Sequence, residues 1–133
     1  MPIKSSSVAK LLLILAVAYS LALLGLSLGN ISDLPSLEIA NADKLYHAMA
    51  YFGLVLLWFM YFFARKANDR FQLKSLLFVC VCALIFGIFI ELLQLTLTTY
   101  RSWDYYDILA NFCGILLAFL VLFPLRKKLE KSK

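Results

Sequence analysis

The sequence is poor in charge. Of its 133 residues, only 16% are Asp, Glu, Lys or Arg, whereas 63% are hydrophobic. Soluble domains carry about 25% charged residues. Glycine and proline are also sparse, with five and three copies. The length suggests one domain, and this composition excludes an ordinary soluble enzyme.

Cysteine is equally limited. The three copies, Cys80, Cys82 and Cys113, all lie inside apolar runs, and no CxxC or Cys/His metal spacing occurs. The sequence therefore gives no indication of a disulfide framework or a zinc site. We expect these cysteines to be buried apolar side chains. A phosphate-binding loop and a nucleophile motif are absent as well.

The net charge of +5 does not indicate a nucleic-acid partner. The basic residues stand beside the ends of the apolar runs, as topology-determining residues of membrane proteins do. They are not accompanied by a helix-turn-helix pattern or by an RNA-binding motif that joins basic and aromatic residues. We therefore expect no nucleic acid.

What the sequence does contain is four long apolar runs, at about residues 8–28, 45–64, 76–98 and 108–125. About 18 or more consecutive apolar residues are enough to cross a bilayer as a helix. The first run is longer than the core of a signal peptide, and no clear cleavage site follows it. The sequence predicts an all-α membrane protein, a single domain over residues 1–133, built as a four-helix transmembrane bundle.

Charge predicts the orientation of this bundle. Eleven Lys and Arg residues lie in the N-terminus, the second connector and the C-terminus, against Lys44 and Arg101 on the other side. Because Lys and Arg are retained on the cytoplasmic side, both termini are predicted to be cytoplasmic. The connectors at 30–44 and 99–107 then face outward.

The first run carries a stripe of small residues, which let helix backbones approach closely. This stripe has two interpretations, packing within the chain or the seam of a homo-oligomer, and comprises Ala18, Ala22, Gly25 and Gly29.

Polar residues collect at the outward ends of the last three predicted helices. Residues three or four positions apart share a helix face, so each of these helices presents a polar stripe. The stripes are Asp43, His47 and Tyr51; Glu91, Gln94 and Thr98; and Asp107, Asn111 and Gly114. Their convergence predicts an outward-opening, water-lined pocket. Membrane lipids and a lipid-linked envelope precursor are the expected partners.

Glu91 lies well inside the third run, where a charge costs at least about 2.5–3.5 kcal/mol. It should therefore face the bundle and find a partner there. Arg101 could supply that partner, or it could pair locally with Asp104.

The polar residues suggest distinct roles. Glu91 and His47 are the acid/base candidates, although whether any reaction is catalysed stays open. The ligand-binding candidates are Asp43, Lys44, Tyr51, Gln94, Arg101, Asp104, Asp107 and Asn111. Lys44 or Arg101 would suit an anionic headgroup. No spacing indicates a metal or another cofactor, and we expect none.

The same residues have a structural interpretation. Glu91 could pin the bundle, and Gln94 and Asn111 could form hydrogen bonds between helices worth about 1 kcal/mol each. The charged residues near the outer ends could form an ordinary solvated rim.

These motifs resemble the VanZ-like family of bacterial membrane proteins. The resemblance covers residues 43–118. It rests on Asp43-Lys44-x-x-His47-x-x-x-Tyr51, Glu91-x-x-Gln94, Arg101, and Asp107-x-x-x-Asn111-x-x-Gly114. The chain departs from the family at Ala118, where the family often has a second glycine.

The resemblance implies a multi-pass protein of the bacterial cytoplasmic membrane with an envelope-side role. The named member of the family is associated with resistance to the glycopeptide teicoplanin, a phenotype that the motif alone does not transfer. Two functions follow as expectations. The first is a pocket that binds or acts on an envelope lipid or a lipid-linked or glycopeptide-related ligand. The second is a non-catalytic scaffold or small permeation unit.

Overall fold

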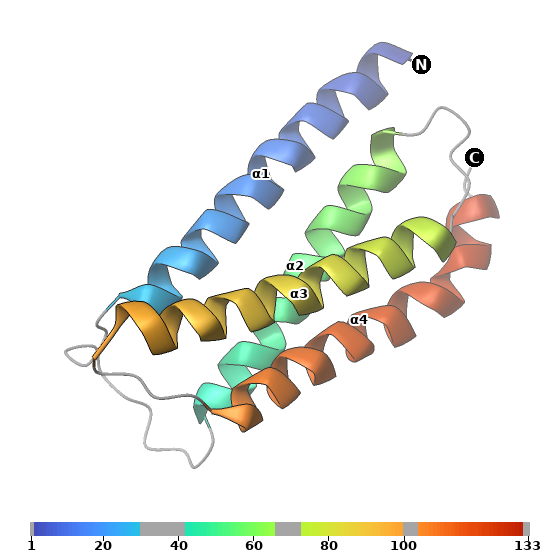
Figure 1. Cartoon of the computed structure of the whole chain (residues 1–133). Coiled ribbons are helices and arrows are strands. Elements are labelled where there is room, and N and C mark those ends of the chain that lie inside the picture. The colour runs from blue at the N-terminus through green and yellow to red at the C-terminus, as the bar shows by residue number, and fades with distance from the viewer. Residues whose placement is uncertain (1, 30–41, 66–72, 100–103, 132–133) are drawn as a thin grey trace.

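The computed structural model describes residues 2–29, 42–65, 73–99 and 104–131. These residues form four helices: α1 (Pro2–Leu28), α2 (Ala42–Arg65), α3 (Leu73–Leu97) and α4 (Tyr105–Lys131) (Figure 1). Each of them is long and apolar enough to cross a membrane. Such segments adopt helices because a helix satisfies its own backbone hydrogen bonds where water is absent. The predicted all-α fold with four spans is confirmed.

The helices extend beyond the apolar runs. α1 begins at Pro2 rather than at residue 8, and α4 continues through Pro124 to Lys131 rather than ending at residue 125. Hydropathy marks the part of a helix that suits hydrocarbon, whereas backbone hydrogen bonds continue into polar flanks. Pro124 removes one of these bonds, the one that its nitrogen would form to the Leu120 carbonyl, but it stands near the end of the candidate span and the helix continues past it.

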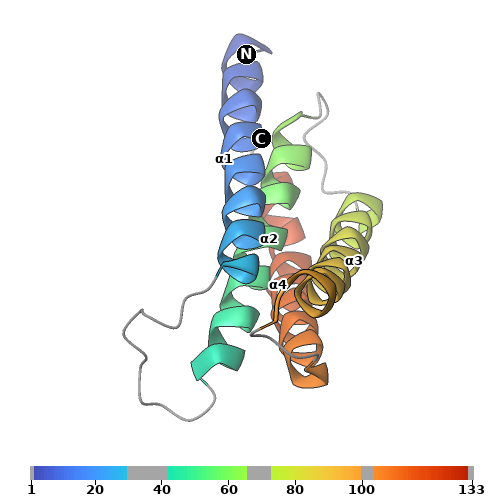
Figure 2. The ribbon, with the colours of Figure 1, turned by 60° about the vertical axis from the view of Figure 1, so that its left-hand side comes forward.

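Successive helices run antiparallel, which gives the molecule two ends (Figures 1 and 2). One end holds Leu28, Ala42, Leu97 and Tyr105 and is called here the network end. The other holds the start of α1, the end of α4, and Arg65 and Leu73, and is called the basic end. Exposed basic residues near it are Lys10, Arg65, Lys74 and Lys128.

α2 is the central helix, since its contacts with α4 and with α1 are the most extensive between helices and it also packs against α3. Its buried side chains Tyr51, Leu54, Val55 and Phe59 form one side of the core. α3 and α4 supply the other side, with Leu76, Val79, Ala83, Ile115, Ala118 and Leu122. Many large apolar residues on the outer faces are exposed, as lipid-facing positions of a membrane bundle are.

Polar contacts fix α1 against α2. The Tyr19 hydroxyl donates to the backbone carbonyl of Ala50 over 2.6 Å. Gly53 makes this approach possible, because a Cβ there would lie 2.8 Å from the Tyr19 oxygen. The Trp58 indole N–H donates to the Ser20 hydroxyl over 3.0 Å, so both polar groups are satisfied within the bundle.

The small-residue stripe faces away from the bundle. Ala18, Ala22 and Gly25 are exposed, and a Cβ on Gly25 would meet nothing within 4 Å. The interpretation that this stripe packs within the chain is therefore wrong, since α1 turns another face to α2. Gly29 is half-buried. A homo-oligomer seam stays a prediction.

The cysteines also differ from expectation. All three are free thiols, but Cys82 and Cys113 are exposed and Cys80 is only half-buried. The prediction of buried cysteines is wrong for Cys82 and Cys113. Because a membrane helix is apolar on every side, hydropathy alone does not distinguish its lipid-facing residues from its core.

Candidate functional site

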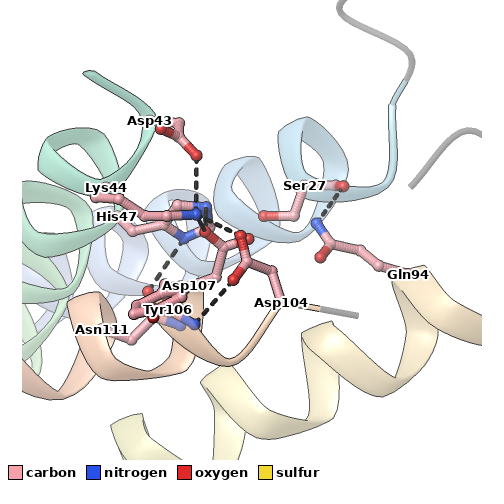
Figure 3. Close-up of polar contacts among 9 residues, drawn as sticks. All are labelled: Ser27, Asp43, Lys44, His47, Gln94, Asp104, Tyr106, Asp107 and Asn111. Carbon is pink, nitrogen blue, oxygen red and sulfur yellow. Dashed lines mark hydrogen bonds and ion pairs between the residues drawn. The ribbon is translucent and has the colours of Figure 1, made fainter. Parts of the chain in front are cut away.

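Lys44, in the first turn of α2, joins three carboxylates at the network end. Its ammonium group donates to Asp43 over 3.0 Å, to Asp104 over 2.6 Å, and to Asp107 of α4 (Figure 3). An ammonium group has three hydrogens, so these contacts match its donor capacity. Three carboxylates around one ammonium leave the group with a net negative charge.

Asp104 has a second role as the residue preceding α4. Its Oδ1 accepts a hydrogen bond from the Tyr106 backbone N–H over 2.9 Å, the arrangement of an N-cap. The hydrogen bond from Lys44, together with this cap, holds the pKa of the Asp104 carboxyl below its usual value of 3.8. One side chain therefore both begins α4 and ties it to α2.

His47 lies one turn deeper than Lys44 and contacts the same helix. Its Nδ1 stands 3.1 Å from Oδ1 of Asn111. An amide oxygen only accepts, so Nδ1 carries the hydrogen in this arrangement. The other ring nitrogen, Nε2, faces Asp107 at 3.7 Å and forms an ion pair when it is protonated. Asp43, Lys44, His47, Asp104, Asp107 and Asn111 are together called the polar network.

Glu91 of α3 lies beside the inner side of this network. It is buried, with 1% of its surface exposed. Gly87, one turn before Glu91, brings the three helices together. A Cβ at Gly87 would lie 3.0 Å from Asn111 Nδ2 and 3.1 Å from the Tyr51 ring. Glu91 thus faces the bundle, as its cost in hydrocarbon predicts.

Gln94 takes a different partner from the other predicted residues. Its amide nitrogen donates to the backbone carbonyl of Ser27 on α1 over 2.7 Å (Figure 3). This carbonyl belongs to the last turn of α1, where helix carbonyls lack partners in their own helix. Gln94 therefore joins α3 to α1 and is not part of the polar network.

Exposure falls gradually from the rim of the network to its interior. The exposed side-chain fraction is 65% at Asp43, 37% at Asp104 and 24% at Lys44. It is 17% at His47 and 12% at Asp107. Of the two acid/base candidates, His47 is partly accessible, whereas Glu91 is buried. The outward-opening pocket stays a prediction.

The structure thus brings together most of the predicted residues, on α2, α3 and α4. Arg101 lies outside the described residues, so its predicted pairing with Glu91 or Asp104 stays a prediction. Among the described residues, Lys44 is the cation that contacts Asp104, together with Asp43 and Asp107. In the part of the chain that the structure describes, no three or more His, Cys, Asp or Glu side chains are placed to hold a metal ion.

Sequence reasoning missed three contributors. It did not single out Gly87, although a glycine one turn before an intramembrane glutamate indicates close helix packing. It did not pair Lys44 with Asp107, which lies 63 positions away. Ser27 contributes only its backbone carbonyl, and no residue type could have revealed that.

Comparison with known proteins identifies relatives. The model of the VanZ/LLP1 family matches residues 4–126. An uncharacterized protein of Schizosaccharomyces pombe is 30% identical over 100 residues, which cover 74% of this chain and 58% of the relative. The chain thus spans little more than half the length of that relative. No solved structure matches.

Proposed function

Because the chain belongs to the VanZ/LLP1 family, and five of the six network residues stand in the motif that resembles this family, we propose that this network binds a lipid headgroup. The ligand is a membrane lipid or a lipid-linked molecule whose headgroup carries hydrogen-bond donors. The protein acts as a multi-pass membrane protein with its site at the network end. The pairing of Lys44 with three carboxylates supports this proposal most directly.

The chemistry of the network favours donors over acceptors in the ligand. Carboxylates only accept hydrogen bonds, and the three hydrogens of the Lys44 ammonium already have partners. A bare phosphate would meet net negative charge and would have to displace these pairs. Hydroxyl groups of a sugar or the ammonium of an ethanolamine would instead meet the partly exposed oxygens of Asp104 and Asp43. The role for Lys44 in binding an anionic headgroup is therefore not the one we propose.

Position in the membrane favours a lipid. Asp43 opens one of the candidate spans, and Asp104 directly precedes another. The network therefore stands at the level of lipid headgroups, where the donors of neighbouring lipids are concentrated.

A matched pair of lipids tests the proposal. Phosphatidylethanolamine and phosphatidylcholine are both zwitterionic, but only the first carries N–H donors. The protein is reconstituted in phosphatidylcholine nanodiscs with a minor fraction of phosphatidylethanolamine or of a glycosyl diacylglycerol, and retained lipid is measured after exchange. We expect enrichment of the donor lipids over phosphatidylcholine. Asp104→Asn should weaken retention roughly tenfold, because one charge-assisted hydrogen bond is lost.

Equal retention of phosphatidylcholine, or an Asp104→Asn variant that retains donor lipids unchanged, would overturn the proposal. Lys128→Gln is the matched control, since it removes a charge at the basic end and should leave retention unaltered. His47→Gln tests the imidazole separately: it keeps a side-chain donor for Asn111 but removes the protonatable ring.

A structural role for the network is the second candidate. The observation in its favour is that Asn111, a member of the network, is buried and bonded to His47 within the chain. A scaffold or permeation unit built in this way would lose folded protein in network variants and show no lipid preference. Thermal unfolding measured beside lipid retention separates the two.

The cytoplasmic position of both termini and the location in the bacterial cytoplasmic membrane belong to this proposal too. The relative from S. pombe is a eukaryotic protein. Orientation is tested in a cysteine-free background with Tyr105→Cys at the network end and Lys128→Cys at the basic end. A membrane-impermeant maleimide applied to intact cells should label only the first.

A further inference from the structure

A separate apolar groove lies between α1, α2 and α3. Its volume is about 370 Å³, and α4 contributes nothing to its lining. The polar network, in contrast, joins α2 to α4. α2 contributes Leu54, Trp58 and Phe62 to the groove, whereas α3 contributes residues between Phe78 and Phe86.

The groove lies entirely inside the membrane-spanning segments and is apolar. All of its lining residues fall within the candidate spans. Its two polar side-chain groups, the Ser20 hydroxyl and the Trp58 indole, are bonded to each other. Water needs two to four polar partners in a cavity. The groove is therefore suited to hydrocarbon and not to water or a polar ligand.

The helices on two sides of the groove, α1 and α3, meet near one end of it and stand apart at the other. At the network end, Gln94 ties α3 to the Ser27 carbonyl of α1 over 2.7 Å. From this contact α1 and α3 diverge toward the basic end (Figures 1 and 2). Toward the basic end, Phe62 of α2 packs edge to face against Phe78 of α3, with ring centroids 6.1 Å apart. Since this pair joins α2 to α3, an acyl chain would enter from the leaflet at the basic end between the diverging helices α1 and α3.

Two cations stand near the end of the groove that faces the basic end. Arg65 follows Phe62 by three positions on α2, and Lys74 precedes Phe78 by four on α3, so each lies on the same helix face as a groove-lining ring. Both are exposed. Basic residues at the membrane surface attract anionic lipid headgroups.

From the shape, lining and charge of this groove, we propose that it binds one acyl chain of an anionic phospholipid. The phosphate of that lipid lies beside Arg65 and Lys74, in the leaflet at the basic end. This site shares only α2 with the helices that carry the polar network, and it differs from the network in its end of the molecule and in its ligand charge. It does not depend on the function proposed above.

Trp58 supplies an intrinsic probe of occupancy. Trp103→Phe replaces the chain's other tryptophan, and bromine on a lipid acyl chain quenches indole fluorescence on contact. The protein is reconstituted in phosphatidylcholine vesicles containing a minor fraction of phosphatidylglycerol or phosphatidylcholine brominated on one chain. We expect brominated phosphatidylglycerol to quench Trp58 at a severalfold lower mole fraction than brominated phosphatidylcholine.

Two further variants identify the site. Cys82→Phe fills the groove and should abolish the headgroup preference, whereas Cys113→Phe on α4 is an equally exposed control that should keep it. Arg65→Gln with Lys74→Gln should remove the preference, at roughly fivefold per basic residue. Circular dichroism confirms that each variant is folded.

Equal quenching by the two brominated lipids in the single-tryptophan protein would overturn the proposal. So would a preference that survives in folded Cys82→Phe protein. If brominated lipids quenched Trp58 only after dilution with excess lipid had dissociated a self-associated form, the occupant of the groove would be a second copy of this chain. That result would also overturn the proposal.

Discussion

Gly114 of α4 packs directly on the backbone of Ala48 in α2. A Cβ added to Gly114 would collide with the carbonyl oxygen of Ala48 and would lie 2.8 Å from its carbonyl carbon. The collision is with backbone, which cannot move aside as the tip of a side chain can. Gly114 lies one turn beyond Asn111, and Ala48 directly follows His47, so this contact sets the separation of α2 and α4 on which the 3.1 Å hydrogen bond between His47 and Asn111 depends.

Gly114→Ala should therefore destabilise the fold and loosen the polar network together. Overpacking of this kind costs about 1–3 kcal/mol. The measurement is thermal or denaturant unfolding in detergent. Gly25→Ala is the control, because a Cβ there meets nothing within 4 Å and should slightly stabilise α1. A Gly114→Ala protein as stable as the parent would contradict the close approach.

Two of the three aspartates that contact Lys44, Asp107 and Asp43, should differ in their contribution to stability. Asp107→Asn removes a carboxylate that joins α2 to α4 and is only 12% exposed, so we expect a loss of about 1–3 kcal/mol. Asp43→Asn removes one that is 65% exposed on the same helix as Lys44, and we expect less than about 1 kcal/mol. Chemical denaturation of the two variants in parallel measures their free energies of unfolding. Equal losses of unfolding free energy would contradict the larger contribution expected of Asp107.

Asp104 should make stability sensitive to acid. Its folded pKa lies below the usual 3.8, so the stability it contributes is fully present above that value. It is lost as the pH falls through the lower folded pKa, when protonation breaks the pair with Lys44. Unfolding temperature measured from about pH 5 to pH 2 should therefore fall less steeply for Asp104→Asn than for the parent. Identical slopes would argue against this pair.

The contact of Gln94 with α1 should be worth about 1 kcal/mol, the usual range for a hydrogen bond between membrane helices. Gln94→Leu removes the bond to the Ser27 carbonyl and should weaken the fold by that amount. Thr96→Val, two residues away, loses only bonds within α3, to Leu92 and Leu93. If the two variants unfold alike, the bond to α1 contributes nothing.

The spans of this fold could be predicted from sequence because about 20 apolar residues in a run have no stable alternative to a membrane helix. The ends of α1 and α4 could not, since helical hydrogen bonds continue through Lys and Ser residues outside the hydrocarbon. The facing of α1 could not be predicted either. Its apolar residues lie on all sides, so no periodicity distinguished the face toward α2 from the stripe around Gly25.

Part of the site followed from sequence for a different reason. An ionisable residue inside a span must turn inward, as Glu91 does on α3. On α4 the same argument applies to Asp107, and helical spacing places Asn111 and Gly114 on the same face as Asp107. The partners of Lys44 and Gln94 could not be predicted, because they depend on which helices become neighbours. Local spacing within α2 or α3 carries no information about that.

The pairing of Lys44 with Asp107 also has a consequence for biosynthesis. The two residues are 63 positions apart, so α2 leaves the ribosome well before its carboxylate partner on α4 exists. Until then Asp43 is the one carboxylate of the network that Lys44 can contact. Once α4 is made, Asp104 and Asp107 reach the same ammonium, so the three-carboxylate arrangement forms only when α2 and α4 have come together.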